Sequence, residues 1–454
     1  MIDRLLRWVD DRVGSAHFVS HALRKAFPDH WSFMLGEINA YAFLILVVTG
    51  TFLALFFDPS AQKVVYHGPY ALLDGTPVSQ AYASALALSF SVNGGLLIRQ
   101  IHHWTALIFV AGIIVHMGRI FFSGAFRKPR EINWVVGVAL FALALLAGFT
   151  GYSLPDDSLS GTGLRIFDSV VLSIPLVGAW LSSLLLGGTF PSSAMLPRLF
   201  VTHVYLLPAA IAGLIGLHLA IVWRQKHTQF PGPGRTENNV VGSPLFPQYA
   251  AKSVALLFAL TAVVVALGAF VQINPIWLWG PYQPWQVASP AQPDWYIGWV
   301  EGALRLGPPF ALHLWGHTVP SPFWPAVLLP TLLFALVLLW PWIEAALRGD
   351  RASHQLLERP RDVPPRTALG VALLLFALGL TLAGSGDVQA RWVHQPITAI
   401  TGFYRWFCIV APLLGFAVTY AFALDLRRRG GVHKAPRVRL RRNARGGFEE
   451  DSIS

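Results

Sequence analysis

Long apolar runs are the feature that most constrains the fold of this chain. A helix that crosses about 30 Å of hydrocarbon needs roughly 20 mostly apolar residues. The 454 residues are 54% hydrophobic and only 13% charged, too few polar residues to cover a water-soluble surface. We therefore expect an all-α integral membrane protein with about eight transmembrane helices, near residues 33–57, 94–122, 132–154, 196–223, 252–273, 322–346, 367–384 and 402–426.

The basic residues predict which side of the membrane each loop faces. Eight spans place the loops alternately on two sides, and 27 of the 34 lysines and arginines fall on the side of the N-terminus. The positive-inside rule then predicts a multi-pass protein with both termini cytoplasmic. We expect residues 1–32 to form an amphipathic N-terminus and residues 427–454 a basic tail. This asymmetry accounts for the net charge of +11 without nucleic acid as a partner.

Cysteine usage limits the redox chemistry of the chain. Only Cys408 is present. A cysteine-ligated iron–sulfur cluster, a covalently attached c-type haem and a disulfide each need at least two cysteines, so none can form within this chain. A redox metal would therefore have to be held by histidine.

Two apolar spans each carry two histidines at matched depths. His102 and His116 are 14 positions apart, so on a helix they share a face and differ in height by about 21 Å. His103 points to nearly the opposite side. His203 and His218 are 15 positions apart, a rise of about 22 Å. Two such helices can hold two non-covalent, bis-histidine b-type haems, with His102 and His203 on the outer iron and His116 and His218 on the inner one.

Other interpretations of membrane histidines stay open at this point. A lone histidine in a span is more often an interhelical hydrogen-bonding residue. A histidine set also suits a haem-free proton-coupled transporter, and paired haem ligands occur in diheme b-type membrane anchors of dehydrogenases or hydrogenases. Matched depth on two helices favours haem.

Two arginines stand where haem propionates would project. Arg99 lies three residues before His102, and Arg119 three residues after His116, both at membrane edges. The alternative for each is an arginine whose side chain reaches from the apolar region to the interface.

Two glycine pairs repeat the spacing of the histidines. Gly36 and Gly50 are 14 residues apart in the first span, and Gly137 and Gly151 are 14 apart in the third. Without side chains they would let flat rings approach the backbone at both depths. The alternative for a single pair is small-residue helix packing.

These residues resemble the cytochrome b subunits of the cytochrome bc complexes. The resemblance covers about residues 30–400 and includes "RQIHHW", "GFTGYSLP", "LSIPLVG" and "PDWY". The doubled "HH", the aspartate of "PDWY" and "RQKHTQFPG" are similar to actinobacterial members. The resemblance implies a four-helix diheme domain at 33–230, in a bacterial cell membrane, and a C-terminal membrane domain at 231–426.

The resemblance also implies a function. It is that of a quinol–cytochrome-c reductase that oxidises quinol, here menaquinol, at an outer site and reduces quinone at an inner site, coupled to proton translocation. The implied partners are a Rieske-type iron–sulfur protein, a c-type cytochrome subunit, a second copy in a homodimer and a terminal oxidase. Because this chain has one cysteine, the cluster and the c-type haem must belong to partner subunits.

The motif at 293–296 marks the outer quinol site. In the family its acidic residue accepts a proton from quinol; here that residue is Asp294, with Tyr296 as its hydrogen-bonding neighbour. An aspartate after a proline can instead cap the following helix, which "WYIGWVEGALRL" predicts. Glu301 is either a second proton acceptor or a solvated helix residue.

The inner quinone site is inferred only from the positions of polar residues near the predicted cytoplasmic ends of the spans. Where the family usually has a histidine after the fourth-span ligands, this chain has Trp223. The candidates are His227, Lys252, Ser253 and Glu37, and for each the alternative is an interfacial polar residue.

Overall fold

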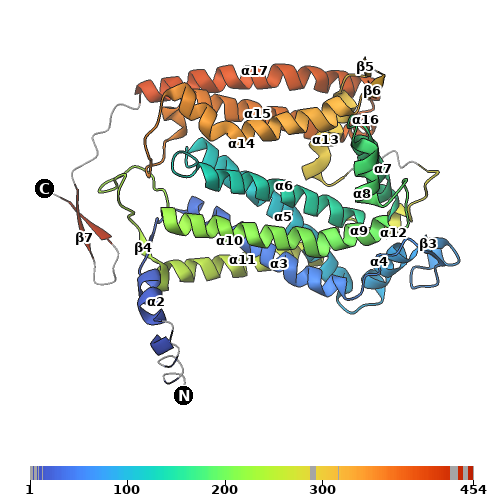
Figure 1. Cartoon of the computed structure of the whole chain (residues 1–454), viewed down its shortest axis with the longest axis horizontal. Helices are drawn as coiled ribbons and strands as arrows, with labels where there is room; N and C mark the ends of the chain where they lie inside the picture. The colour runs from blue at the N-terminus through green and yellow to red at the C-terminus, as the bar shows by residue number, and fades with distance from the viewer. Residues whose placement is uncertain are drawn as a thin grey trace.

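Eight long helices dominate the described part of the chain. The computed structural model describes residues 4, 8, 10–12, 14–286, 293–314, 316–429, 438–442 and 448–452. Within them, eight helices are long and apolar enough to cross a membrane, and they run side by side (Figure 1). These spans are Leu35–Ala54 (α3), Gly95–Phe122 (α5), Glu131–Ser153 (α6), Met195–Gln225 (α9 and α10), Leu245–Phe270 (ending in α11), Trp324–Arg348 (ending in α14), Pro364–Gly384 (α15) and Ile397–Arg429 (α17).

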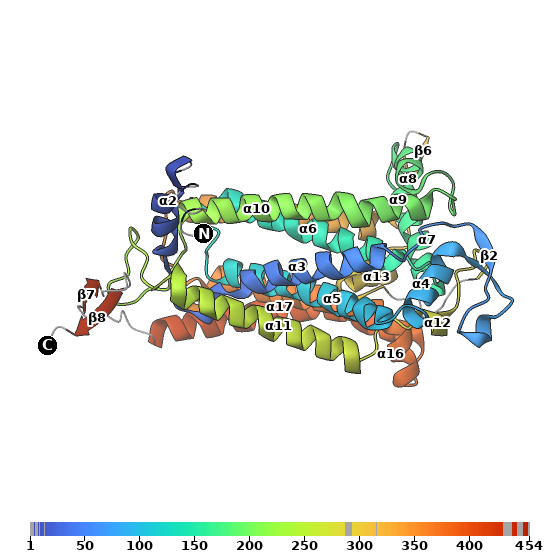
Figure 2. The same cartoon turned by 90° about the horizontal axis from the view of Figure 1, so that it is seen from below.

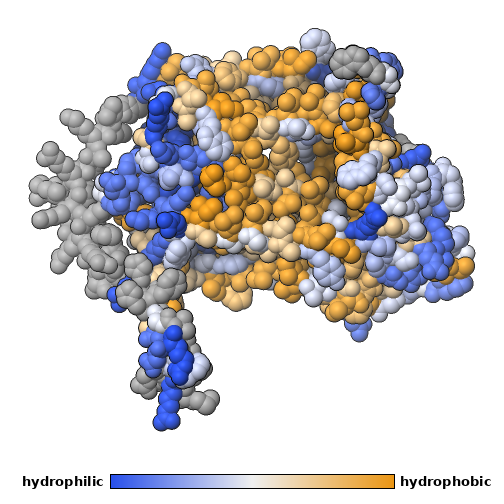
Figure 3. Space-filling model, in the orientation of Figure 1, coloured by the Kyte–Doolittle hydropathy of each residue, from blue (hydrophilic) through white to orange (hydrophobic). Residues whose placement is uncertain are grey.

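The spans confirm the predicted fold class. Each lies close to its predicted range, because apolar length and composition are local properties and a backbone in hydrocarbon must satisfy its own hydrogen bonds. An apolar belt separates two polar ends of the molecule (Figure 3). The chain is therefore a multi-pass helical membrane protein.

The spanning helices form two groups. The first contains α3, α5, α6 and α10, with α11 (Ala250–Phe270) against α5 and α3. Its apolar core includes Ala42, Val110, Ala144 and Val264, which lie between the depths of the paired histidines. The second group contains α14, α15 and α17; α15 packs along α17 and along the short helix α13 (Trp295–Leu306), and α14 packs against α6 (Figures 1 and 2).

Short elements gather at the two ends of the spans. At the end near Arg99 lie α4 (Gln80–Phe90), α7 (Ser158–Leu172), α8 (Gly178–Leu186), α12 (Ile276–Trp279) and the hairpin of β2 (Lys63–Val65) with β3 (Pro77–Ser79) (Figure 1). Nearby are α16 (Gly386–Trp392) and the hairpin of β5 (Leu312–Leu314) with β6 (His317–Val319). A capping box of Asp157 and Ser160 starts α7.

The opposite end carries the pieces nearest the chain termini. Helix α2 (Ser15–Leu23) forms within the predicted amphipathic segment, of which residues 1–3, 5–7, 9 and 13 lie outside the described residues. Strands β1 (Ala26–Phe27) and β4 (Ser243–Pro244) pair here. Beyond Arg429, the described part of the tail is an antiparallel pair, β7 (Val438–Arg442) and β8 (Phe448–Ser452), which the sequence did not lead us to expect.

A largely buried ion-pair network at this end connects Glu358 with three arginines from different parts of the chain. Glu358 accepts hydrogen bonds from Arg348 and Arg366, 2.8 and 2.7 Å away, and pairs with Arg127 at 3.2 Å. Arg366 is only 2% exposed. Burial alone would raise the pKa of Glu358, but the hydrogen bond from Arg348 and the charges of Arg366 and Arg127 lower it to about 2.

Replacing this carboxylate should destabilise the protein. We expect Glu358→Gln to lower the free energy of unfolding by on the order of 3 kcal/mol at pH 7, because it removes the counter-ion of Arg127 and leaves Arg348 and Arg366 with Glu344 alone. The control is Asp425→Asn, which removes an exposed pair with Arg429 and should change little. Denaturation in detergent, followed by tryptophan fluorescence, measures both.

The same carboxylate should make stability depend on pH. Because its folded pKa lies below the unfolded value of about 4.3, its stabilisation is complete above that value and is lost as the pH falls toward 2. The difference between wild type and Glu358→Gln should therefore shrink between pH 5 and pH 3. An undiminished difference at pH 3 would contradict this.

Candidate functional site

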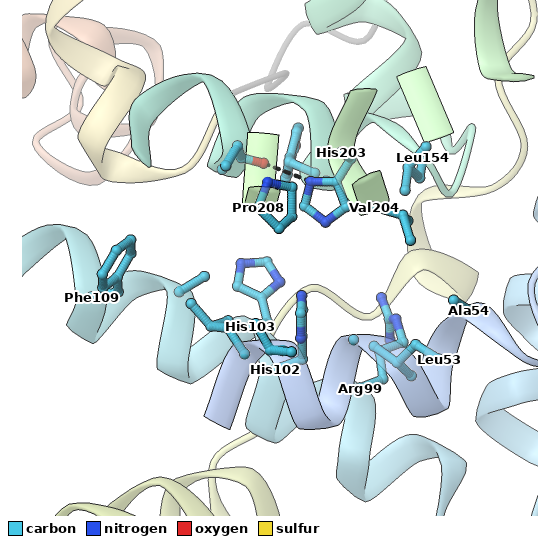
Figure 4. Close-up of a pocket in the computed structure, with 18 of the residues that line it drawn as sticks. Leu53, Ala54, Arg99, His102, His103, Phe109, Leu154, His203, Val204 and Pro208 are labelled. Carbon is cyan, nitrogen blue, oxygen red and sulfur yellow. Dashed lines mark hydrogen bonds between the residues drawn. The ribbon is translucent and has the colours of Figure 1, made fainter. Parts of the chain in front are cut away.

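A first cavity opens between facing histidines near one end of the spans. His102 of α5 and His203 of the span that contains α10 point toward one another across it (Figure 4). Their ring centroids are 6.3 Å apart, with ring planes inclined by 75°. Apart from these rings and a few polar groups, the lining is largely apolar, including Phe109 and Val110.

A second cavity repeats this geometry deeper along the same helices. His116 and His218 face one another with ring centroids 6.5 Å apart and planes inclined by 71°. The structure thus pairs His102 with His203 and His116 with His218, as the helical periodicity predicted.

The ring separations suit a metal held by two imidazoles. A ligating nitrogen lies about 2 Å from its metal, which puts each ring centroid about 3 Å away, so two opposed ligands are separated by roughly 6 Å. Both histidine pairs have this separation. Each cavity thus offers two facing imidazoles, which is the ligand set that fits a planar macrocycle with one axial ligand on each side.

Each predicted glycine lies against one of the paired histidines. A Cβ atom on Gly151 would lie 2.8 Å from Nε2 of His203, and one on Gly50 would lie 3.1 Å from Cε1 of His102. A Cβ atom on Gly36 would lie 3.4 Å from Cε1 of His116, and one on Gly137 would lie 3.9 Å from Cε1 of His218. The glycines therefore make room for the imidazoles themselves, most tightly in the first cavity.

Hydrogen bonds fix the orientation of the first histidine pair. Nδ1 of His102 lies 2.9 Å from Oγ1 of Thr49, whose hydroxyl donates to the Ile45 carbonyl, so the threonine oxygen accepts. Nδ1 of His203 lies 2.9 Å from the Ala147 carbonyl, which can only accept. Both rings therefore carry hydrogen at Nδ1 and leave the Nε2 lone pair free for a metal.

Two arginines present unpaired N–H groups to the cavities. Arg99 lines the first cavity and donates from Nη2 to the Asn274 carbonyl at 2.6 Å, while its buried Nη1 has no partner among the described residues. Arg119 lines the second cavity, and its buried Nε and Nη2 likewise lack partners in that part of the chain. Such groups are suited to anionic substituents such as propionates.

Asp294 meets two hydrogen-bond donors at the edge of the first cavity. Nε2 of His103 lies 3.0 Å from its Oδ1, and the hydroxyl of Tyr296 donates to its Oδ2 at 3.0 Å. All three residues line the cavity. Although Asp294 occupies the N-cap position of α13, its side chain makes no capping hydrogen bond, so the capping alternative does not describe it.

Glu301 lies elsewhere. Its carboxylate pairs with Arg305 at 2.5 Å, Arg305 also pairs with Asp387 at 2.8 Å, and Glu301 does not line the first cavity. It is 9% exposed, so it is an ion-paired residue and not a solvated one.

Two of the four inner candidates share one hydrogen-bond cluster. Glu37 lines the second cavity and accepts hydrogen bonds from Ser253, at 2.5 Å, and from Tyr249. Tyr41 lies 2.5 Å from the Ser253 hydroxyl. Lys252 instead forms an exposed ion pair with Asp29 and does not line the cavity.

His227 also lines the second cavity. Its ring lies 4.7 Å from that of Phe27. Burial, and then the charges of Lys25, Arg119 and Arg130, lowers the pKa of His227 to about 4. The imidazole is therefore neutral at neutral pH and can both donate and accept a hydrogen bond.

Sequence reasoning missed two features of these cavities. His103 was set aside because it faces away from His116, and the only available signal was its place in the doubled "HH". Thr49 and Thr150 each directly precede a predicted glycine, Gly50 and Gly151, a repetition that marks both as residues beside the first histidine pair.

Comparisons with known proteins identify relatives of this chain. A family model described as "Cytochrome b(N-terminal)/b6/petB" matches residues 107–281. A "Cytochrome bc1 complex cytochrome b subunit" of Mycobacterium leprae is 49% identical over 421 residues, covering 92% of this chain and 76% of that protein. The protein with the same name from Streptomyces coelicolor is 49% identical over 431 residues, covering 94% and 78%. The solved structure "Hyperthermophilic respiratory Complex III" is similar in fold, with a TM-score of 0.69 at 20% identity over 92% of this chain and 100% of that one.

Proposed function

This chain belongs to the cytochrome b subunits of the bc1 complexes, the quinol–cytochrome-c reductases, and on that premise we propose how its two cavities share the reaction. Family membership implies b-type haem and a place in a multisubunit complex. We propose two haems, one per cavity, quinol oxidation beside the first cavity and quinone reduction beside the second. Family membership leaves the membrane-anchor and transporter alternatives without support.

The facing histidine pairs are the observation that carries this proposal. His102 and His203 would hold one haem iron, and His116 and His218 the other, because each pair has the separation of two axial imidazoles. Arg99 at the first cavity and Arg119 at the second would bind the propionates. When bound, the two haems supply one-electron transfer along the bundle.

The residues around Asp294 would handle the protons of quinol. Oxidation of one quinol to quinone releases two electrons and two protons. Asp294 accepts one proton from the quinol hydroxyl, and Tyr296 holds the carboxylate in place. Glu301 remains a candidate second acceptor only by its position in the sequence, since Arg305 occupies its carboxylate.

Partner subunits would complete the electron path. The single cysteine leaves this chain unable to hold an iron–sulfur cluster or a c-type haem, so a Rieske-type protein and a c-type cytochrome subunit would take electrons from quinol oxidation. We also propose a homodimer, association with a terminal oxidase, and menaquinol as the donor.

The distribution of basic residues supports an orientation. With both termini cytoplasmic, the first cavity faces outward and the second inward. Protons are then released outside and taken up inside, near Glu37, Ser253 and the neutral His227. Lys252 lies outside the cavity, in an exposed ion pair with Asp29, and has no role in this proposal.

Haem content tests the proposed ligation. The purified protein should show two b-type haems in a dithionite-reduced minus oxidised spectrum, counted per chain as pyridine haemochrome. His102→Ala and His116→Ala should each lose one, because each removes one axial ligand. The control His317→Ala, on the exposed β6 strand, should keep both. A colourless wild-type protein would reject the proposal and favour a proton-relay transporter.

The glycines predict an asymmetry between the two cavities. Gly151→Ala should displace the His203 ring and remove or perturb one haem, because the new Cβ would lie 2.8 Å from Nε2. Gly137→Ala is the matched change in the second cavity and should leave both haems in place, because its Cβ would make ordinary contact with His218 at 3.9 Å. Equal haem loss in both variants, read from the same spectra, would contradict the geometry.

A further inference from the structure

His103 lies beside the proposed haem ligand His102 but makes a different contact. It follows His102 directly on α5, yet its ring points to Asp294, 191 positions along the chain. The side chains of His103 and Asp294 are only 15% and 16% exposed, so this hydrogen bond is largely shielded from solvent. A shielded contact between distant segments is expected to hold its partners in a fixed arrangement.

The Asp294 carboxylate is held from two directions. His103 donates to Oδ1 from α5, and Tyr296 donates to Oδ2 from α13. Tyr296 is itself fixed, being 3% exposed with its ring against Gly148 of α6, where a Cβ would lie 2.6 Å from Cζ. With one donor on each oxygen, the carboxylate has little freedom to rotate.

We propose that His103 is a positioning residue for quinol oxidation, which holds the Asp294 carboxylate toward the first cavity at a fixed place beside His102. This inference rests on the proposed role of Asp294 as proton acceptor. It requires only that the Nε2–H group of His103 donates to the Asp294 carboxylate. Because His102 and His103 are consecutive on one rigid helix, the proton acceptor and the outer haem ligand are fixed relative to one another.

The test compares substitutions at His103 in the complete membrane complex. His103→Leu keeps a bulky side chain but removes the donor; His103→Gln keeps an N–H donor. We expect His103→Leu to lower kcat for quinol oxidation by about 10-fold or more, with KM changed less than about twofold, because a misplaced proton acceptor slows the chemical step and not binding. His103→Gln should recover much of that loss, and spectra should show both b-type haems in each variant.

Trp104→Phe is the matched structural control. It removes the neighbouring hydrogen bond of α5, from Nε1 of Trp104 to the Val271 carbonyl at 2.8 Å, without touching Asp294. Its kcat should stay close to wild type. If it slows turnover as much as His103→Leu does, or if His103→Gln gives no recovery, the positioning role is wrong. Should His103→Leu not assemble, His103→Ala replaces it in the comparison with His103→Gln.

A double substitution separates this inference from the proposed function. If His103 acts through Asp294, adding His103→Leu to Asp294→Asn should cost less than twofold in kcat beyond the single Asp294→Asn variant. A full additional 10-fold loss would overturn the positioning role while leaving Asp294 as acceptor. Normal turnover in Asp294→Asn alone would overturn the proposed role of Asp294, and the inference with it. Loss of all haem from the wild type would reject the haem assignment instead.

Discussion

The rest of this structure depends on one constraint, which is that α5 and the span that contains α10 face one another through paired histidines. At each of two depths, one imidazole from each helix faces the other, with ring centroids 6.3 Å apart in the first pair and 6.5 Å apart in the second. These separations fix how closely the two helices approach one another. Glycines on α3 and α6 leave room for those rings, and an apolar core fills the space between the two depths. Helices α14, α15 and α17 form a second group beside this bundle (Figure 1).

Features set by local periodicity could be predicted from the sequence. Apolar length gave the eight spans, and a 14- or 15-residue spacing on 3.6-residue helices paired the histidines. The contact of His103 with Asp294 could not be predicted in this way. Helical periodicity shows that His103 faces away from His116. It does not identify Asp294 as the partner, because that contact depends on the path of a loop outside the helix. The Glu301–Arg305 pair is different, because its i, i+4 spacing on one helix is a local signal that predicts an ion pair from the sequence.

Under the proposed function, the first cavity would bring proton and electron chemistry together on one turn of α5. His102 faces His203 across the cavity, and the next residue, His103, contacts the carboxylate of Asp294. Oxidation of quinol removes both electrons and protons, and the adjacent positions of His102 and His103 would keep the outer haem and the Asp294 carboxylate within reach of a single bound molecule. The polar residues of the second cavity are arranged differently, because Glu37 accepts hydrogen bonds from Ser253 and Tyr249.

The placement of the histidines also bears on how such a protein is made. Under the proposed ligation, α5 carries one ligand for each haem, and the fourth span carries both of the others, His203 and His218. During synthesis, neither haem can gain its second axial ligand until this fourth span has entered the membrane. The two sites then become complete in the same insertion step, so the haems join an early helix pair, α3 with α5, to a later one, α6 with α10. Under the proposed ligation, both ligand sets therefore depend on insertion of this one span.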